Sequence, residues 1–428
     1  MGVKPSHILG MNARHYYTRM NSSKAKSYGF SKLKTKELML SAGNPTASLY
    51  HIFSSRKELD TIHWESIPVP FVIKPVNGLA GKGIWIITKK MTDESSWRNN
   101  FNDEITKEDL DLHVQNILDG EYSTWGRNHR CLVEEMIPVH PSLAKYTYKG
   151  TPDIRVIVFN SVPVMAMARI PTEESEGKAN LDQGAIGLGI DIASGVTTYG
   201  IQGKSGYITH FPHIKKKVNG IIIPEWQRVL EVAVKAAEAA GYKYMGADIF
   251  IHPEKGPMIV ELNGYPGLSI QLANKAGLKR RLERVEGLEV RDAKHGVKIA
   301  RALFAESFAD KIKVEEGIQI ISTQPTVKVV GDDATRHSTE ALVNTGRYRS
   351  AISSQFAESL GLLDLEDLLW RQQESIEGKV PVVEVAFILK GTMIKTAMVV
   401  TKRLNRTKHK IELGRKDIQG FLIGETEE

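Results

Sequence analysis

Apolar and polar positions along the chain follow the period of β-strands in several places. Residues 68–87 predict a strand, a glycine-rich loop and a second strand, and residues 132–137 predict an apolar strand interrupted by acids. Residues 151–170 predict two strands joined by a turn at Val162-Pro163. Residues 245–263 predict two more apolar strands joined by a Pro/Gly turn.

Other segments have the period of a helix. A short helix is predicted around residues 35–41, and a longer one over residues 297–308. The clearest helix opens at Pro224, since proline suits the first helical turn, and ends at Gly241. Its apolar stripe consists of Trp226, Val229, Leu230, Ala233, Ala237 and Ala240.

The pattern changes towards the C-terminus. A charged connector, residues 310–317, is followed by mostly short β-branched strands over residues 325–428. Residues 381–401 predict a hairpin around Lys390-Gly-Thr392. We therefore predict two domains, residues 1–317 and residues 318–428.

Composition narrows the class of protein. The 428 residues are 41% apolar and 25% charged, as in ordinary globular proteins, and no apolar run approaches the roughly 18 residues of a membrane helix. The single cysteine, Cys131, excludes an internal disulfide and fits a reducing cytoplasm. A net charge of +7 suits a polyanionic ligand. The basic clusters have few interleaved aromatic residues, so nucleic-acid binding is not favoured.

The hairpin over residues 245–263 carries acids where a plain core would carry Val or Leu. If Ile251 pairs with Met258, Asp248 falls opposite Glu261, and Asn263 shares a face with Glu261. Like charges in opposite positions destabilise a strand pair, so a cation is expected between them. Three converging oxygen ligands suit Mg²⁺ bound to a nucleotide. A surface hairpin with solvated acids is the alternative, and the apolar flanks argue against it.

The earlier glycine loop is the natural place for phosphates. The strand Phe71-Val-Ile-Lys74-Pro75 is followed by Val76-Asn-Gly-Leu-Ala-Gly-Lys-Gly83, in which glycines let backbone amides approach phosphate oxygens. On its own this loop is equally consistent with a simple turn.

The order of motifs is more specific than any one of them. In sequence they are Lys74 with the glycine loop, Leu132-Val-Glu-Glu-Met-Ile137, Asp153-Ile-Arg-Val156, Arg169, Asn180, Asp248 and Glu261-Leu-Asn263. This order resembles the ATP-grasp superfamily over about residues 10 to 300. It is most like the α-L-glutamate ligase-like, or sugar-transfer-associated, branch, relatives of the ribosomal-protein glutamate ligase. Gly10-Met-Asn-Ala-Arg14 and Lys32-Leu-Lys-Thr-Lys36 resemble that branch's N-terminal signature.

The resemblance implies an α+β fold whose two lobes clasp ATP, and it implies roles for individual residues. Phosphates would be held by Lys36, Lys74, Gly78, Gly81, Lys82 and Gly83, and the adenine and ribose by Glu134, Glu135, Met136 and Ile137. Mg²⁺ would be held by Asp248, Glu261 and Asn263, and the γ-phosphate or substrate carboxylate by Arg155 and Arg169, with Asn180 beside them. The implied reaction is phosphorylation of a carboxylate by ATP, followed by attack of an amine on the acyl phosphate. The carboxylate would belong to an amino acid or peptide.

The C-terminal segment resembles a different family. Leu342-Val-Asn344-Thr-Gly, and later Lys410-Ile-Glu-Leu-Gly414, are similar to the active-site strands of all-β retropepsin-like aspartic peptidases, in particular a group labelled ATP-dependent zinc proteases. Zinc itself is not favoured, because this segment has no His-Glu-x-x-His motif and offers only His337 and His409 as nitrogen ligands. Such peptidases need two carboxylates sharing a proton, so one turn per chain implies a homodimer through this domain.

Position 344 departs from that pattern, because asparagine stands where aspartate is expected. An amide does not titrate, so no peptidase activity is predicted for this chain. Either the residue was substituted to inactivate an enzyme or the domain has become a binding and dimerisation module. The nucleotide site likewise has a second interpretation, an ATP-binding scaffold without ligation, and the sequence leaves both alternatives open.

Overall fold

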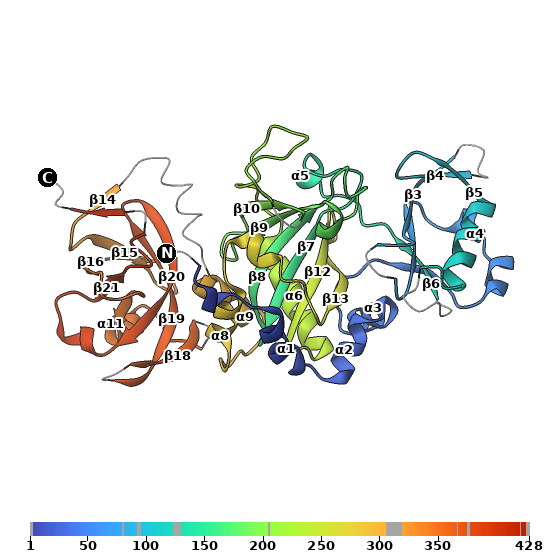
Figure 1. Ribbon diagram of the computed structural model, residues 1–428. Coiled ribbons are helices and arrows are strands. Elements are labelled where there is room, and N and C mark those ends of the chain that lie inside the picture. The colour runs from blue at the N-terminus through green and yellow to red at the C-terminus, as the bar shows by residue number, and fades with distance from the viewer. Residues whose placement is uncertain are drawn as a thin grey trace. The chain divides into compact units, whose positions relative to one another are not determined.

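A computed structural model of the protein describes residues 3–78, 81–91, 96–122, 130–203, 206–304, 319–365, 367–374, 377–419 and 421–424. The chain divides into two compact units (Figure 1). The first comprises Met1–Ile190 and Thr197–Arg284, and the second comprises Asp191–Val196 and Val285–Glu428. The domain boundary that we predict near residue 318 falls at the end of a stretch outside the described residues, and it stays a prediction. None of the described helices is long and apolar enough to cross a membrane.

Short helices open the first unit: η1 (Pro5–His7), α1 (Met11–Arg19), α2 (Ser23–Gly29) and α3 (Lys32–Ser41). The hydroxyl of Ser31 caps α3 by accepting the N–H of Lys34. The predicted helix over residues 35–41 is therefore confirmed but begins earlier. As a consequence Lys32 and Lys36, four residues apart, lie on one face of α3.

A six-stranded sheet with α4 (Lys107–Leu118) packed on it forms one lobe of this unit. Its core is aromatic and includes Phe53, Trp64, Phe71 and Trp97. The predicted strands over residues 68–87 and 132–137 are confirmed as β2 (Phe71–Pro75), β3 (Trp85–Lys90) and β6 (Cys131–Glu135). In spatial order the strands are β1 (Leu49–Phe53), β6 (Cys131–Glu135), β2 (Phe71–Pro75), β3 (Trp85–Lys90), β4 (Ser96–Asn99) and β5 (Glu104–Thr106), with η2 (Arg56–Asp60) and η3 (Trp64–Ser66) after β1.

A seven-stranded antiparallel sheet forms the second lobe, with α6 (Trp226–Ala240) packed on it (Figure 1). In spatial order the strands are β11 (Gly206–Ile208), β10 (Thr197–Gln202), β9 (Ile186–Ile190), β8 (Val162–Ile170), β7 (Asp153–Phe159), β12 (Tyr244–His252) and β13 (Gly256–Asn263). The remaining helices are α5 (Pro141–Ala144), η4 (Leu181–Gln183), α7 (Ile270–Asn274) and α8 (Leu278–Val285).

Two boundaries in this lobe differ from the sequence prediction. The turn between β7 and β8 lies at Asn160 and Ser161, whose φ angles are 52° and 56°, because two successive positive φ values are what a tight hairpin turn needs. Val162-Pro163, predicted as the turn, lies inside β8. Helix α6 begins at Trp226, two residues after Pro224, and ends at Ala240 with the predicted Gly241 as its C-cap.

The hairpin of β12 and β13 pairs Asp248 with Glu261, as predicted, although the assumed register is wrong. Ile251 pairs with Pro257 and not with Met258, and the register shifts between Asp248 and Ile249. This irregularity inserts one extra residue into β13, which brings the two acids back into opposition.

In the second unit, α9 (Ala293–Phe304) precedes a closed ring of strands. The predicted helix over residues 297–308 is thus confirmed up to Phe304, and its last four residues lie outside the described ones. The ring, with β18 at its edge, is β15 (Thr326–Val330), β16 (Arg336–Asn344), β21 (Ile411–Gly414), β17 (Ala351–Ser353), β20 (Thr392–Thr401), β19 (Gly378–Leu389) and β18 (Leu368–Glu374), and β15 also pairs with β19. A pair of short parallel strands, β14 (Gln319–Ile321) and β22 (Phe421–Ile423), completes the unit with α11 (Ser354–Ser359) and η5 (Arg403–Arg406).

The predicted strand-rich C-terminus and the hairpin around Lys390-Gly-Thr392 are confirmed. Apolar residues of the ring fill its interior, among them Val327, Val385, Phe387 and Leu413.

Candidate active site

A cavity of about 680 Å³ lies in the first unit, within the size range of small-molecule sites. It brings together most of the side chains predicted from the sequence. Those that line it are Lys36, Lys74, Gly81, Lys82, Gly83, Glu134, Glu135, Met136, Ile137, Arg155, Arg169, Asn180, Asp248, Glu261 and Asn263. Gly78 does not line it, and Asn344 belongs to the second unit.

Strand register places a row of charges on one face of the second lobe's sheet. Arg155 on β7 lies directly across from Asp248 on β12, which lies across from Glu261 on β13. Two residues along β7, Asp153 lies across from Arg169 on β8. Because side chains two residues apart share a face, all of these groups point into the same cavity.

The cations that pair with Asp248 are two arginines. Arg155 donates from Nε and Nη2 to the two carboxylate oxygens of Asp248, at 2.7 and 2.6 Å. Arg169 donates from Nη2 to Asp248 at 2.8 Å and contacts Asp153 through Nε and Nη2, at 2.8 and 2.6 Å. Burial alone would raise the pKa of Asp248, but Arg155 and Arg169 lower it below its usual value. Asp248 is therefore an anion although it is only 4% exposed.

The oxygen atoms beside this row fit a hard divalent cation. Asp248 and Glu261 supply carboxylates, and Asn263, across from Gly246 in the register, supplies an amide oxygen that also accepts the N–H of Tyr265. Such an all-oxygen set suits Mg²⁺. No three His, Cys, Asp or Glu side chains gather as a metal site in the described part of the chain.

A second charged cluster in the cavity consists of lysines around one acid. Glu134 on β6 forms ion pairs with Lys74 on β2 and, at 2.9 Å, with Lys36 on α3. Burial raises the pKa of Glu134, but the two ammonium groups outweigh burial and lower it. Burial lowers the pKa of Lys36, against the pull of Glu134. The cluster keeps one positive charge in excess, which suits phosphate oxygens.

The glycine loop is held from two sides. Lys32 on α3 donates to the carbonyl oxygen of Gly78 at 2.8 Å, and Nε2 of His113 lies 3.1 Å from the carbonyl oxygen of Gly83. His113 stacks on Trp85 with ring centroids 4.1 Å apart, and burial lowers its pKa to about 4. Gly83 has φ +70° and lies against Tyr122, so a side chain here would be strained and crowded.

The residues predicted to hold adenine and ribose make hydrogen bonds to neighbouring segments of the first unit. Glu135 accepts from the backbone and hydroxyl of Ser48 and pairs with Lys255, and the N–H of Met136 donates to the carbonyl of Pro70. The carbonyl of Ile137 accepts from Thr151.

Two predicted residues have local structural contacts. The side chain of Asn180 caps η4 by accepting the N–H of Asp182 at 3.0 Å while lining the cavity. Burial raises the pKa of the Cys131 thiol, so this side chain remains protonated in the core of the first lobe.

Asn344 ends β16 in the second unit. Its Oδ1 accepts the N–H of Gly346 at 3.0 Å, and its Nδ2 lies 3.4 Å from Oε2 of Glu412. Glu412 is buried and receives two hydrogen bonds from Arg403, at 2.9 and 2.6 Å. Asn344 thus donates to a carboxylate that is already ionised.

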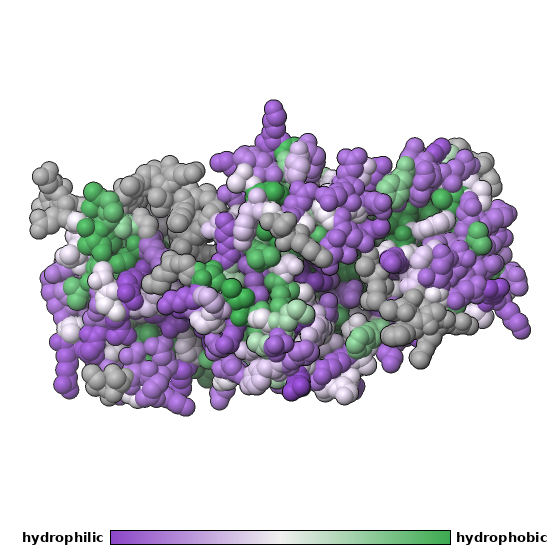
Figure 2. All heavy atoms as spheres, in the orientation of Figure 1, coloured by the Kyte–Doolittle hydropathy of each residue, from purple (hydrophilic) through white to green (hydrophobic). Residues whose placement is uncertain are grey.

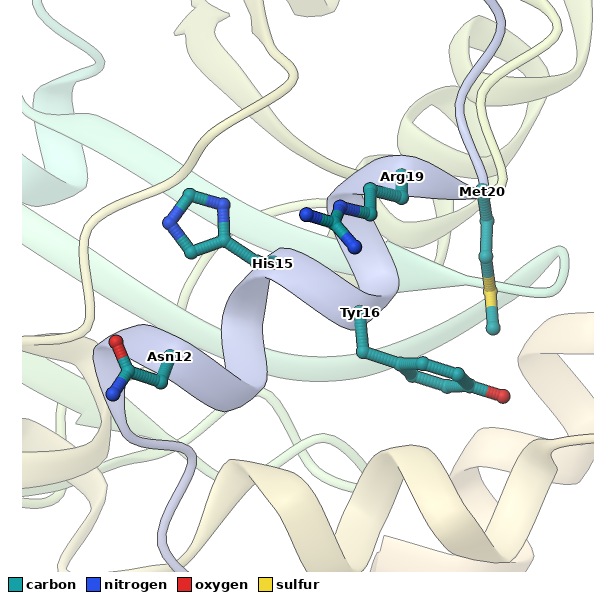
Figure 3. Close-up of a pocket in the computed structure, with 5 residues that line it drawn as sticks. All are labelled: Asn12, His15, Tyr16, Arg19 and Met20. Carbon is teal, nitrogen blue, oxygen red and sulfur yellow. The ribbon is translucent and has the colours of Figure 1, made fainter.

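A separate hollow of about 630 Å³ follows the exposed face of α1. Figure 3 shows its five lining residues, with His15 and Arg19 pointing to one side of the helix and Tyr16 and Met20 to the other. Because these side chains diverge, we assign no chemistry to this hollow.

Sequence reasoning missed three residues of the cavity's surroundings. Asp153 stood in a quoted motif without a role, although its spacing of two from Arg155 predicts a shared face. Lys32 could have been found from its spacing of four from Lys36. No sequence signal identifies His113, since its contact with Gly83 joins segments 30 residues apart.

Several solved structures are similar to this chain at low identity and low TM-score. A biotin carboxylase–β,γ-ATP complex from Campylobacter jejuni is 14% identical with TM-score 0.41, covering 66% of this chain and 53% of its own. A D-Ala:D-Ser ligase from Enterococcus faecalis is 15% identical with TM-score 0.36, covering 62% and 63%. A D-alanine–D-alanine ligase from Bacillus anthracis is 13% identical with TM-score 0.33, covering 71% and 77%. The chain thus covers only about half of the length of the biotin carboxylase.

No protein with a curated description matches the chain. The family described as sugar-transfer associated ATP-grasp, however, matches residues 11–287, which is more than half of the sequence. These residues contain the lysine cluster, the glycine loop and the charged row. The chain belongs to the sugar-transfer associated ATP-grasp family.

Proposed function

We propose that this protein is a ligase that joins a carboxylate to an amine at the expense of ATP. ATP-grasp enzymes use ATP and Mg²⁺, and both suit the charges of the cavity. The observation that carries the proposal is that one cavity contains both a lysine cluster with excess positive charge and a row of carboxylates with two arginines. The first suits phosphates, and the second suits a divalent cation and an anionic substrate.

Individual roles follow from this division. Lys36 and Lys74 would hold phosphate oxygens, with Glu134 as their counter-ion, and the backbone amides of the glycine loop would add further donors. Asp248 and Glu261 would hold Mg²⁺ together with Asn263. The backbone around Met136 and Ile137 would face the adenine, as the family resemblance implies.

The reaction needs no nucleophile from the protein. A carboxylate oxygen of an amino acid or peptide attacks the terminal phosphorus of ATP, the bond to ADP breaks, and an acyl phosphate forms. The amine then attacks the acyl carbon, inorganic phosphate leaves, and the amine loses a proton. Bound Mg²⁺ supplies charge neutralisation on the phosphates, and the chain's own lysines and arginines position the groups.

ADP release measured across a panel of amino acids, with and without amines, tests the proposal. We expect release that requires both a carboxylate and an amine, and mass spectrometry should show the condensed product. Asp248→Asn should lower turnover by roughly 10²–10³, whereas Lys408→Ala, in an exposed ion pair of the second unit, should leave it unchanged. Nucleotide binding without turnover under every combination would instead favour the alternative, an ATP-binding scaffold.

For the second unit we propose a retropepsin-like module that recognises peptides and dimerises without cleaving them. It is supported by β21, which lies between β16 and β17 and pairs Gly414 with Asn344. It is also supported by an apolar patch over β14 and β22 (Figure 2), where Ile320, Leu422 and Ile423 are 45, 54 and 42% exposed.

Sedimentation of the whole chain tests the dimer. Leu422→Glu should shift it to monomers, and a parent protein that remains monomeric at high concentration would contradict the dimer. We place the protein in a reducing cytoplasm, which suits its single free cysteine.

A further inference from the structure

The two arginines beside Asp248 are held unequally. In the part of the chain that the structure describes, both hydrogen bonds of Arg155 go to Asp248. Arg169 instead forks onto Asp153 through Nε and Nη2 and makes a single contact, from Nη2, with Asp248. One arginine therefore depends wholly on Asp248, and the other does not.

The inequality is built into the strand register. Arg155 faces Asp248 across β7 and β12, while Arg169 faces Asp153 across β8 and β7. Asp153 is 4% exposed and sits at the start of β7, and both of its carboxylate oxygens are engaged by Arg169. Rigid strands on both sides leave it little freedom to serve another partner.

Binding of a cation to Asp248 would affect the hydrogen bonds of the two arginines differently. Carboxylate oxygens that ligate a metal are no longer fully available to guanidinium groups. Arg169 would keep its fork on Asp153, whereas Arg155 would lose both of its hydrogen bonds. A nearly buried guanidinium without an anion is costly, so Arg155 must then find another anionic oxygen pair in the cavity.

We propose that Arg155 and a divalent cation compete for Asp248, and that Asp153 is the positioning residue that keeps Arg169 out of this competition. With Asp248 engaged as a metal ligand, Arg155 would turn to the terminal phosphate of the nucleotide bound in the same cavity. This inference rests on the proposed function, because it takes Asp248 as a metal ligand.

Mn²⁺ binding to the nucleotide-free protein, followed by the electron paramagnetic resonance signal of free Mn²⁺, tests the competition without any turnover. Arg155→Met removes the competitor and should tighten Mn²⁺ binding about tenfold. Asp153→Asn leaves Arg169 with Asp248 as its only carboxylate and should weaken Mn²⁺ binding by a similar factor. The double variant Asp153→Asn/Arg169→Met should return close to the parent affinity.

The Mn²⁺ affinity should rise in Arg155→Met and fall in Asp153→Asn. A general loss of structure would instead lower the affinity of both variants. If Arg155→Met does not fold, Arg155→Lys keeps the charge but loses the fork, and it should tighten binding to a smaller extent. If Asp248→Asn abolishes Mn²⁺ binding but the affinities of Arg155→Met and Asp153→Asn change in the same direction, or do not change, the inference is wrong although the metal site stands. Mn²⁺ binding that Asp248→Asn leaves intact would overturn the inference and the proposed metal site together.

The destination of Arg155 is tested by calorimetry with Mg²⁺ and either ADP or the β,γ-imido analogue of ATP. Arg155→Met should weaken binding of the triphosphate analogue about tenfold and that of ADP by much less. Equal losses for the two nucleotides would show that Arg155 does not reach the terminal phosphate.

Discussion

Glu134 is the acid that keeps two buried lysines together, so its neutralisation is a sharp test of the lysine cluster. The Glu134→Gln substitution preserves shape and removes the charge. Its side chain is only 8% exposed, and it pairs with Lys36 and Lys74, which are equally buried. Two ammonium groups would then face a neutral amide. Breaking buried ion pairs by removing one partner costs about 3–5 kcal/mol.

The expected magnitude can be read from urea unfolding of the first unit. With a denaturant slope near 3 kcal/mol per molar for a unit of this size, the midpoint should fall by roughly 1–2 M. Because nucleotide phosphates replace the missing anion, Mg²⁺–ATP should stabilise the variant more than it stabilises the parent. The stability loss should therefore shrink as nucleotide is added.

A matched double variant separates charge from packing. Glu134→Gln/Lys36→Met removes one lysine together with the acid, and it should recover much of the lost stability. If Glu134→Gln unfolds at the parent's urea midpoint, or if nucleotide stabilises parent and variant equally, Glu134 is not the counter-ion of a phosphate-binding cluster.

Three further changes should have distinct readouts. Burial lowers the pKa of His113 from 6.5 to about 4, so the side chain is neutral in the folded protein. As the pH falls, the unfolded chain binds a proton here before the folded protein does, so the free energy of unfolding should be complete above pH 6.5 and fall by about 3 kcal/mol towards pH 4. His113→Phe should abolish this pH dependence in urea titrations. Gly83→Ala would place a methyl group 2.6 Å from the ring of Tyr122 at φ +70°, so KM for ATP should rise about tenfold, and an unchanged KM would contradict a role for this loop in nucleotide binding. Asn344→Asp would set a second carboxylate against Glu412; we expect a loss of about 1–2 kcal/mol at neutral pH by denaturation, diminishing below about pH 4, and no gain of peptide cleavage. Cleavage by that variant would show that the barrel is an inactivated peptidase.

The sequence alone determined several elements and the family of this protein, because local periodicity and motif order can be recognised without knowledge of tertiary contacts. It predicted α6, the glycine loop between β2 and β3, and the opposition of Asp248 and Glu261. It also placed the ATP-grasp motifs in family order, and the match over residues 11–287 confirms that membership. Each of these features depends on residues close together in the chain or on a fixed order of types.

Only the tertiary structure decided which charges meet. The extra residue in β13 shifts the strand register, and the alternation of polar and apolar residues does not reveal where such a bulge lies. The fork of Arg169 on Asp153, the lysine cluster around Glu134 and the contact of His113 with Gly83 join segments 16 to 98 residues apart. Long-range partners of this kind are selected by the packing of sheets and helices, and no local signal in the sequence specifies them.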